Sequence, residues 1–161
     1  MKEVKVLLVC LGNICRSPMA DGLLRKKVDE LGLNVFVDSA GTINQHQGQA
    51  PDERMQATAA SFGVPIDDLR ARQFDVSDFD YFDWIYVMDD SNFKNIGRVA
   101  RTDEDMTKVS MILNEVHPNQ NKSVPDPYFG GKQGFIDVFN MLDEATDKIV
   151  TKLKQTLNGE G

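Results

Sequence analysis

Hydrophobic residues in this chain fall into short β-branched runs that alternate with longer stretches of helical spacing. The first run, residues 4–9, is apolar at nearly every position, which is typical of a strand buried on both faces of a parallel sheet. A helix that Gly32 ends is then predicted by four apolar residues at helical spacing, Ala20, Leu24, Val28 and Leu31. Similar patterns predict strands at 35–37, 84–88 and 109–113, and helices at 51–62, 90–97 and 135–153.

This alternation predicts an α/β fold, a doubly wound four-stranded parallel sheet with helices on both faces. The 161 residues suffice for one sizeable hydrophobic core and are too few for two. We therefore expect residues 1–161 to form a single domain. Its functional residues should lie at the carboxyl ends of the strands.

Between the first strand and the first helix lies the segment Cys-Leu-Gly-Asn-Ile-Cys-Arg-Ser, residues 10–17. Ser17 is expected to cap the helix, Pro18 to take its first position, and Asp21 to lie in the first turn, where the helix dipole favours negative charge. A loop in this place collects the unpaired N–H groups of a helix start, which bind phosphate well. The segment thus predicts a phosphate-binding loop after the first strand, with contacts from Leu11, Gly12, Asn13, Ile14, Cys15, Arg16 and Ser17.

Side chains of this loop add chemistry that the backbone lacks. Cys10, facing the helix start, is expected to be a thiolate and therefore a nucleophile. The planar guanidinium of Arg16 can hold two phosphoryl oxygens at once. Gly12 lets the backbone approach an anion closely, and Asn13 tolerates a positive φ. Ser17 is placed to donate a hydrogen bond to the Cys10 sulfur.

Charge and cysteine usage narrow the function further. The net charge of −7 argues against nucleic acid as a partner, because phosphate-backbone binding needs a cationic surface. No apolar stretch reaches membrane-spanning length, and the first strand starts too early to leave room for a signal peptide, so we expect a cytoplasmic protein without membrane insertion. The only two cysteines share one loop and the two histidines are scattered, so no metal site and no cofactor are expected.

A second candidate for chemistry is Asp126, which stands between two prolines in the segment Val-Pro-Asp-Pro-Tyr. A thiolate cannot supply the proton that the leaving oxygen of a phosphate ester needs, whereas a carboxylic acid can. The flanking prolines stiffen the backbone around this carboxyl group. Tyr128 would then form a wall beside an aromatic leaving group.

The loop pattern C-x5-R followed by S-P, filled in as CLGNICRSP, resembles the active-site loop of low-molecular-weight protein tyrosine phosphatases, and the Asp-Pro-Tyr segment resembles the same family. The resemblance implies that Ser39 supports the loop by hydrogen bonds, although an ordinary loop serine is an equal alternative. It also implies a supporting structural role for Asp89. Two positions depart from the family: Gln45 stands where an aromatic residue is common, with His46 beside it, and Leu69 stands where a histidine is common.

The resemblance implies hydrolysis of phosphotyrosine in a protein substrate by a monomeric, metal-independent enzyme. Cys10, Arg16 and Asp126 would be its catalytic residues. Two alternatives remain open. A thioredoxin-coupled arsenate reductase would need further cysteines beyond residue 15, which the chain lacks. A phosphate-binding module without turnover would need no acid, and Asp126 argues against it.

Overall fold

Four parallel strands form one sheet in this structure, a computed structural model that describes residues 2–128 and 130–159. Their spatial order is β2-β1-β3-β4, and their bounds are Val4–Cys10 (β1), Val35–Gly41 (β2), Trp84–Val87 (β3) and Val109–Met111 (β4). The predicted parallel α/β fold is confirmed. Because β1 has β2 on one side and β3 on the other, the order in which strands are added to the sheet reverses at β1. Doubly wound proteins bind their ligands at the carboxyl ends of the strands at such a point.

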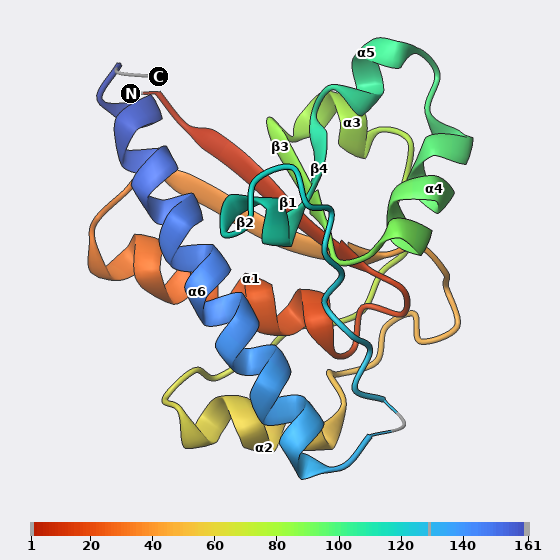
Figure 1. Ribbon diagram of the computed structural model, residues 1–161, viewed down its shortest axis with the longest axis vertical. Helices are drawn as coiled ribbons and strands as arrows, with labels where there is room; N and C mark the ends of the chain where they lie inside the picture. The colour runs from red at the N-terminus through yellow and green to blue at the C-terminus, as the bar shows by residue number, and fades with distance from the viewer. Residues whose placement is uncertain (1, 129, 160–161) are drawn as a thin grey trace.

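Helices cover both faces of the sheet (Figure 1). One face packs against α1 (Arg16–Glu30), α2 (Glu53–Ser61) and α6 (Lys132–Leu157), and the other against α3 (Asp78–Tyr81), α4 (Asp90–Val99) and α5 (Asp103–Met106). A 3₁₀ turn, η1 (Ile112–Glu115), follows β4. The strand β1 is buried on both sides, with Val6, Leu8 and Cys10 facing the α1 side and Leu7 and Val9 the other. The side chain of Cys10 is therefore directed toward the start of α1.

The start of α1 differs from the prediction. The helix begins at Arg16, so Ser17 lies inside it and does not cap it, and Pro18 is its third residue. Cys15 takes the N-cap position without a side-chain cap hydrogen bond. Because no side chain caps them, the first N–H groups of α1 remain available to an anion. Ser17 was predicted wrongly as a cap because its hydroxyl is used inside the loop.

Other boundaries were shifted by tertiary contacts. Asp21 lies beyond the first turn of α1 and is buried, and Leu31 is half exposed at the C-cap, outside the buried stripe of the helix. Gly32, with φ +63°, ends the helix as expected. The short helices α3 and α5 were not predicted, because four-residue helices carry too little periodicity to be recognised.

Gly41, the last residue of β2, lies directly against the backbone of the loop that follows β1. A Cβ atom at this position would lie 2.7 Å from the Leu11 carbonyl oxygen and 3.0 Å from the Asn13 nitrogen. Backbone atoms cannot swing aside as a side chain can, so only glycine lets the two segments touch.

We expect Gly41→Ala to lower the free energy of unfolding by about 1–3 kcal/mol, since it overpacks the loop against β2. Urea denaturation measures this. The matched control is Gly97→Ala in α4, whose new Cβ meets only Met106 Cε at 3.8 Å and should stabilise the helix. Equal stability of Gly41→Ala and the wild type would contradict the close contact.

Candidate active site

Asn13 holds the loop open from its centre. Its backbone has φ +59°, a left-handed conformation that asparagine tolerates, and its side chain is buried. Its Oδ1 accepts a hydrogen bond from the backbone nitrogen of Arg72 (3.0 Å), and its Nδ2 donates to Ser17 Oγ (2.8 Å) and Ser39 Oγ (3.0 Å). One amide group is thus fixed by the end of its own loop and by two other segments of the chain, and Ser39 of β2 is one of its partners.

The direction of these bonds determines where the Ser17 proton goes. Because the Asn13 oxygen accepts from Arg72, both Nδ2 hydrogens are left for the two serines. Ser17 Oγ already accepts one of them, so its own hydrogen is free to point at Cys10 Sγ, 3.0 Å away. The other acceptor near this hydroxyl, the Ala40 carbonyl, is farther at 3.4 Å. The network therefore aims a hydrogen-bond donor at the cysteine sulfur, where it would stabilise a thiolate.

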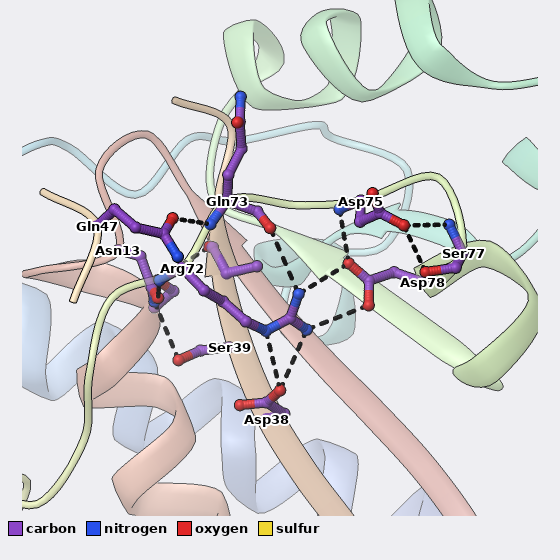
Figure 2. Close-up of polar contacts among 11 residues, drawn as sticks. Asn13, Asp38, Ser39, Gln47, Arg72, Gln73, Asp75, Ser77 and Asp78 are labelled. Carbon is purple, nitrogen blue, oxygen red and sulfur yellow. Dashed lines mark hydrogen bonds and ion pairs between the residues drawn. The ribbon is translucent and has the colours of Figure 1, made fainter. Parts of the chain in front are cut away.

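Arg72 anchors this network to the rest of the fold (Figure 2). Its guanidinium binds Asp38 of β2 (Nε to Oδ2, 3.1 Å) and Asp78 of α3 (Nη1 to Oδ2, 3.0 Å, and Nη2 to Oδ1, 3.2 Å). Burial lowers the pKa of Arg72, but the two carboxylates outweigh it and raise the pKa overall. With Leu69 in the usual place of a histidine, the Asn13 support in this chain rests on the Arg72 backbone and its two ion pairs.

Arg16 extends from the first turn of α1 with a side chain that is only 3% exposed. Its Nη1 donates to Asp89 Oδ2 (2.7 Å) and to the Val124 carbonyl (2.9 Å), while its Nη2 lies 3.6 Å from Asp126 Oδ2. Burial lowers the pKa of Arg16, but Cys10 and Asp89 outweigh this and raise it. The buried guanidinium is therefore charged and fixed in direction.

Asp89 has two tasks. It is the N-cap of α4, where Oδ1 accepts from the Asn92 nitrogen (2.8 Å) while Oδ2 accepts from Arg16. The Asn92 side chain in turn accepts from the Asp89 nitrogen and so completes a capping box. The carboxylate that orients Arg16 is thus itself oriented by the start of a helix, which agrees with the supporting role expected for it.

A cavity of about 230 Å³ brings the predicted catalytic residues together. Asp126 reaches it from the segment after η1, with a side chain 42% exposed and its Oδ1 accepting from the Tyr128 nitrogen (3.0 Å). Ile43 was not predicted and also contributes, because a lone apolar residue in a loop gives no sequence signal. The residues that line the cavity are Cys10, Leu11, Gly12, Ile14, Cys15, Arg16, Ile43, Gln45, His46, Asp126 and Tyr128.

The remaining predicted residues support this cavity without lining it: Asn13, Ser17, Ser39 and Asp89. Cys15 lines it as a buried free thiol, and burial, followed by the charge of Asp52, raises its pKa. Cys15 is therefore protonated near neutral pH, and Cys10 is the cysteine that faces the Ser17 donor.

Residues 2–128 and 130–159 contain neither a metal-binding cluster nor a membrane-spanning helix. No group of three or more histidine, cysteine, aspartate or glutamate side chains in this part of the chain could hold a metal ion. No helix in the same ranges is long and apolar enough to span a bilayer.

Asp21 is a buried carboxyl group behind the loop, 1% exposed. Its Oδ1 lies 3.3 Å from Arg25 Nε without hydrogen-bond geometry. The pKa of Asp21 is raised to about 7, mainly by burial; Asp38 and Asp68 contribute to the rise, whereas Arg25 and the Ser39 hydroxyl oppose it. Between pH 3.8 and about 7 the folded protein therefore keeps a proton that the unfolded chain releases.

Because the folded protein binds more protons than the unfolded chain in this range, its free energy of unfolding falls as the pH rises from 3.8 to about 7. Asparagine cannot ionise, so Asp21→Asn should remove the slope and gain on the order of 1–3 kcal/mol relative to the wild type between about pH 4 and about pH 8. Urea unfolding at several pH values measures the slope. The control Asp68→Asn, whose carboxyl is exposed, should keep it; an unchanged slope in Asp21→Asn would contradict the assignment.

Comparisons with known proteins agree on one family. A family model described as low molecular weight phosphotyrosine protein phosphatase matches residues 5–158. A protein of that name from Schizosaccharomyces pombe is 42% identical over 144 residues, which cover 88% of this chain and 91% of the relative. Among solved structures, a protein tyrosine phosphatase from Entamoeba histolytica with Hepes in its active site superposes with a TM-score of 0.88 at 35% identity, covering 95% of this chain and 98% of that one.

Another similar structure carries a different substrate name. The Drosophila arginine phosphatase superposes with a TM-score of 0.86 at 30% identity, covering 94% of this chain and 98% of that one. The fold and the level of identity therefore do not by themselves distinguish a phosphorylated phenol from a phosphorylated guanidine.

Proposed function

The chain belongs to the low molecular weight phosphotyrosine protein phosphatase family, and we propose that Cys10, Arg16 and Asp126 hydrolyse phosphotyrosine in a protein substrate. One observation carries this assignment: the Cys10 sulfur, the Arg16 guanidinium and the Asp126 carboxyl line the same cavity at the start of α1. Enzymes of this family act through a cysteine and without a metal ion.

In the first step the Cys10 thiolate attacks phosphorus in line with the bond to the leaving oxygen. The sulfur–phosphorus bond forms as the phosphorus–oxygen bond breaks, and Asp126 gives its proton to the departing phenol oxygen. A dianionic phosphoryl group on Arg16 competes with Asp126 for the guanidinium, 3.6 Å away in the free protein. The bound anion thereby takes the place of Asp126 on the guanidinium and frees the carboxyl group to face the leaving oxygen.

In the second step water attacks the phosphorus of the cysteinyl phosphate. Asp126, now a carboxylate, accepts a proton from this water, and the Cys10 thiolate leaves. The Ser17 hydroxyl, 3.0 Å from the sulfur, stabilises the negative charge that returns to it. Inorganic phosphate is the product, and the second step returns Cys10 to the thiolate and Asp126 to the acid with which the cycle began.

Arg16 and the backbone N–H groups of residues 11–16 stabilise the transition state of both steps. A planar guanidinium can bind two equatorial oxygens of the transferring phosphoryl group. Its two fixed partners, Asp89 and the Val124 carbonyl, both bind Nη1, which leaves Nε and Nη2 for the substrate. The direction of the guanidinium is therefore set before the substrate arrives, so little reorganisation is needed during the reaction.

Phosphotyrosine is favoured by the walls of the cavity. The Tyr128 ring and the Ile43 side chain offer apolar surface for an aromatic leaving group. Gln45 and His46 provide polar contacts at the mouth, where other family members carry an aromatic side chain, so selectivity among phosphoproteins should differ from theirs. Arsenate reduction through a cysteine relay is disfavoured, because the chain has no cysteine beyond Cys15.

We place the enzyme in the cytoplasm, as a single catalytic domain over residues 1–161 that works as a monomer. A nucleophile that must stay a free thiol suits a reducing compartment. Cys10, Arg16 and Asp126 line one cavity of this chain, so the proposed mechanism needs no residue from a second copy.

We expect Cys10→Ser to abolish turnover of p-nitrophenyl phosphate and phenyl phosphate, because the nucleophile is lost. Asp126→Asn should reduce kcat/KM, which reports the first step, by about 10²–10⁴-fold for phenyl phosphate and much less for p-nitrophenyl phosphate, whose phenolate leaves without a proton. Steady-state kinetics without added metal measure both. Asp137→Asn, an exposed position of α6 that does not line the cavity, is the matched control.

An equal decrease in kcat/KM for the two esters in Asp126→Asn would contradict the role of Asp126 as the acid. Phosphoarginine serves as the competing substrate in the same assay. Faster hydrolysis of phosphoarginine than of phosphotyrosine would overturn the proposed substrate class and leave the cysteine mechanism intact.

A further inference from the structure

A second cavity, of about 560 Å³, lies between α2 and the start of α6. Figure 1 shows α2 beside the first turns of α6, on the same side of the sheet as α1. The second cavity is lined from α2 by Arg54 and Ala57, from the end of that helix by Phe62, and from α6 by Lys132 and Phe135. None of these residues has a role in the mechanism above.

A single side chain separates the second cavity from the active site. The Arg54 guanidinium carbon lies 5.3 Å from the centre of the Tyr128 ring, which lines the active site, and 4.7 Å from the centre of the Phe135 ring, which lines the second cavity. The two rings are therefore no more than about 10 Å apart, the length of three residues of extended peptide. A peptide bound by its phosphotyrosine can reach the second cavity with a neighbouring residue.

The partition between the cavities is held in place. Arg54 forms a two-pronged ion pair with Asp52, the N-cap of α2, through Nε (3.1 Å) and Nη2 (2.9 Å). Asp52 in turn donates its backbone N–H to the carbonyl of Ile14 in the phosphate loop (2.8 Å). The wall of the second cavity is thus built on the same loop that holds the phosphoryl group.

The floor of the second cavity is apolar, and its rim carries positively charged side chains. Phe135 is buried, and Phe62, 45% exposed, stacks on Phe139 with ring centres 4.0 Å apart. Lys132 forms no ion pair with any residue in the described ranges, and Nη1 of Arg54 forms no hydrogen bond there. Among the residues that the structure describes, no acidic side chain lines the cavity. In a chain of net charge −7, this is a local positive site beside an exposed apolar floor.

We propose that the second cavity binds a residue two or three positions from the phosphotyrosine of the protein substrate, an apolar side chain with an acidic residue next to it. This inference rests on the proposed function and specifies its substrate. The apolar side chain covers Phe62 and Phe135, and the acidic one pairs with Lys132 and Arg54. Burial of one large side chain corresponds to at least a tenfold gain in peptide affinity.

The test compares three phosphotyrosine peptides in steady-state kinetics. The first peptide carries Glu at the third and Leu at the second residue before the phosphotyrosine. The second carries Leu at the second and Glu at the third residue after it. The third carries Ser at all four of these positions. We expect one of the first two peptides to show a KM about tenfold below that of the serine peptide. Equal KM values for all three would overturn the proposal.

Two variants assign the effect to the second cavity. Ala57→Phe fills it from an exposed position of α2, and Lys132→Glu reverses the charge at its rim. Both should raise KM for the preferred peptide about tenfold while leaving kcat/KM for p-nitrophenyl phosphate unchanged, because that ester is too small to reach past Arg54. Retention of the peptide preference in both variants would overturn the assignment.

Matched controls lie on the same helices outside the second cavity. Ala60→Phe is exposed on α2, and Lys148→Glu lies sixteen residues beyond Lys132 on α6, about 24 Å along the helix. Both should keep the peptide preference. The p-nitrophenyl phosphate assay also separates the two failures: no turnover of this ester by the wild type contradicts the proposed function, whereas turnover without peptide preference contradicts only the second cavity.

Discussion

The three hydrogen bonds of the buried Asn13 amide are the constraint on which the site depends. A loop that must present its N–H groups to an anion cannot also satisfy them internally, so it needs support from elsewhere. Asn13 provides it by taking a left-handed backbone conformation and by binding, through its side chain, Ser17 at the end of its own loop and two other segments at Ser39 and Arg72. Because the same amide donates to Ser17 Oγ, the Ser17 hydrogen is free to point at Cys10 Sγ, 3.0 Å away. Loop shape and nucleophile environment therefore have one origin.

The charged Arg16 side chain is likewise held in position before the substrate arrives. A guanidinium that is 3% exposed would be costly without partners, and Asp89 together with the Val124 carbonyl supplies them. Asp89 is held by the α4 cap, and Arg72 by Asp38 and Asp78. These ion pairs let a chain of net charge −7 present a local positive site to a dianion. Tyr128 and Arg54 separate the active-site cavity from the second cavity, and we expect specificity for the rest of the substrate to be determined there.

The sequence predicted the features that come from a repeating hydrophobic pattern or from short-range residue preferences. Buried strands and long amphipathic helices come from hydrophobic periodicity, and the Cys10–Ser17 loop and Asp126 carry residue types that phosphoryl transfer needs. The structure brings Cys10, Arg16 and Asp126 into one cavity, which spacing alone could not guarantee across more than a hundred residues. Local rules failed at Ser17, where a cap signal was overridden by hydrogen bonds to Asn13 and Cys10 within the loop. The ion pairs of Arg72 were missed because nothing local distinguishes them from surface charges.

The most direct test of this account is to trap the covalent intermediate. Asp126→Asn should be mixed rapidly with p-nitrophenyl phosphate, quenched in acid and digested, and the peptide that contains residues 10 and 15 sequenced by mass spectrometry. The first step needs little acid catalysis with this ester while the second lacks its base, so the account predicts a phosphoryl group on Cys10. A phosphoryl group on Cys15 or elsewhere, or turnover with no phosphorylated cysteine, would contradict it.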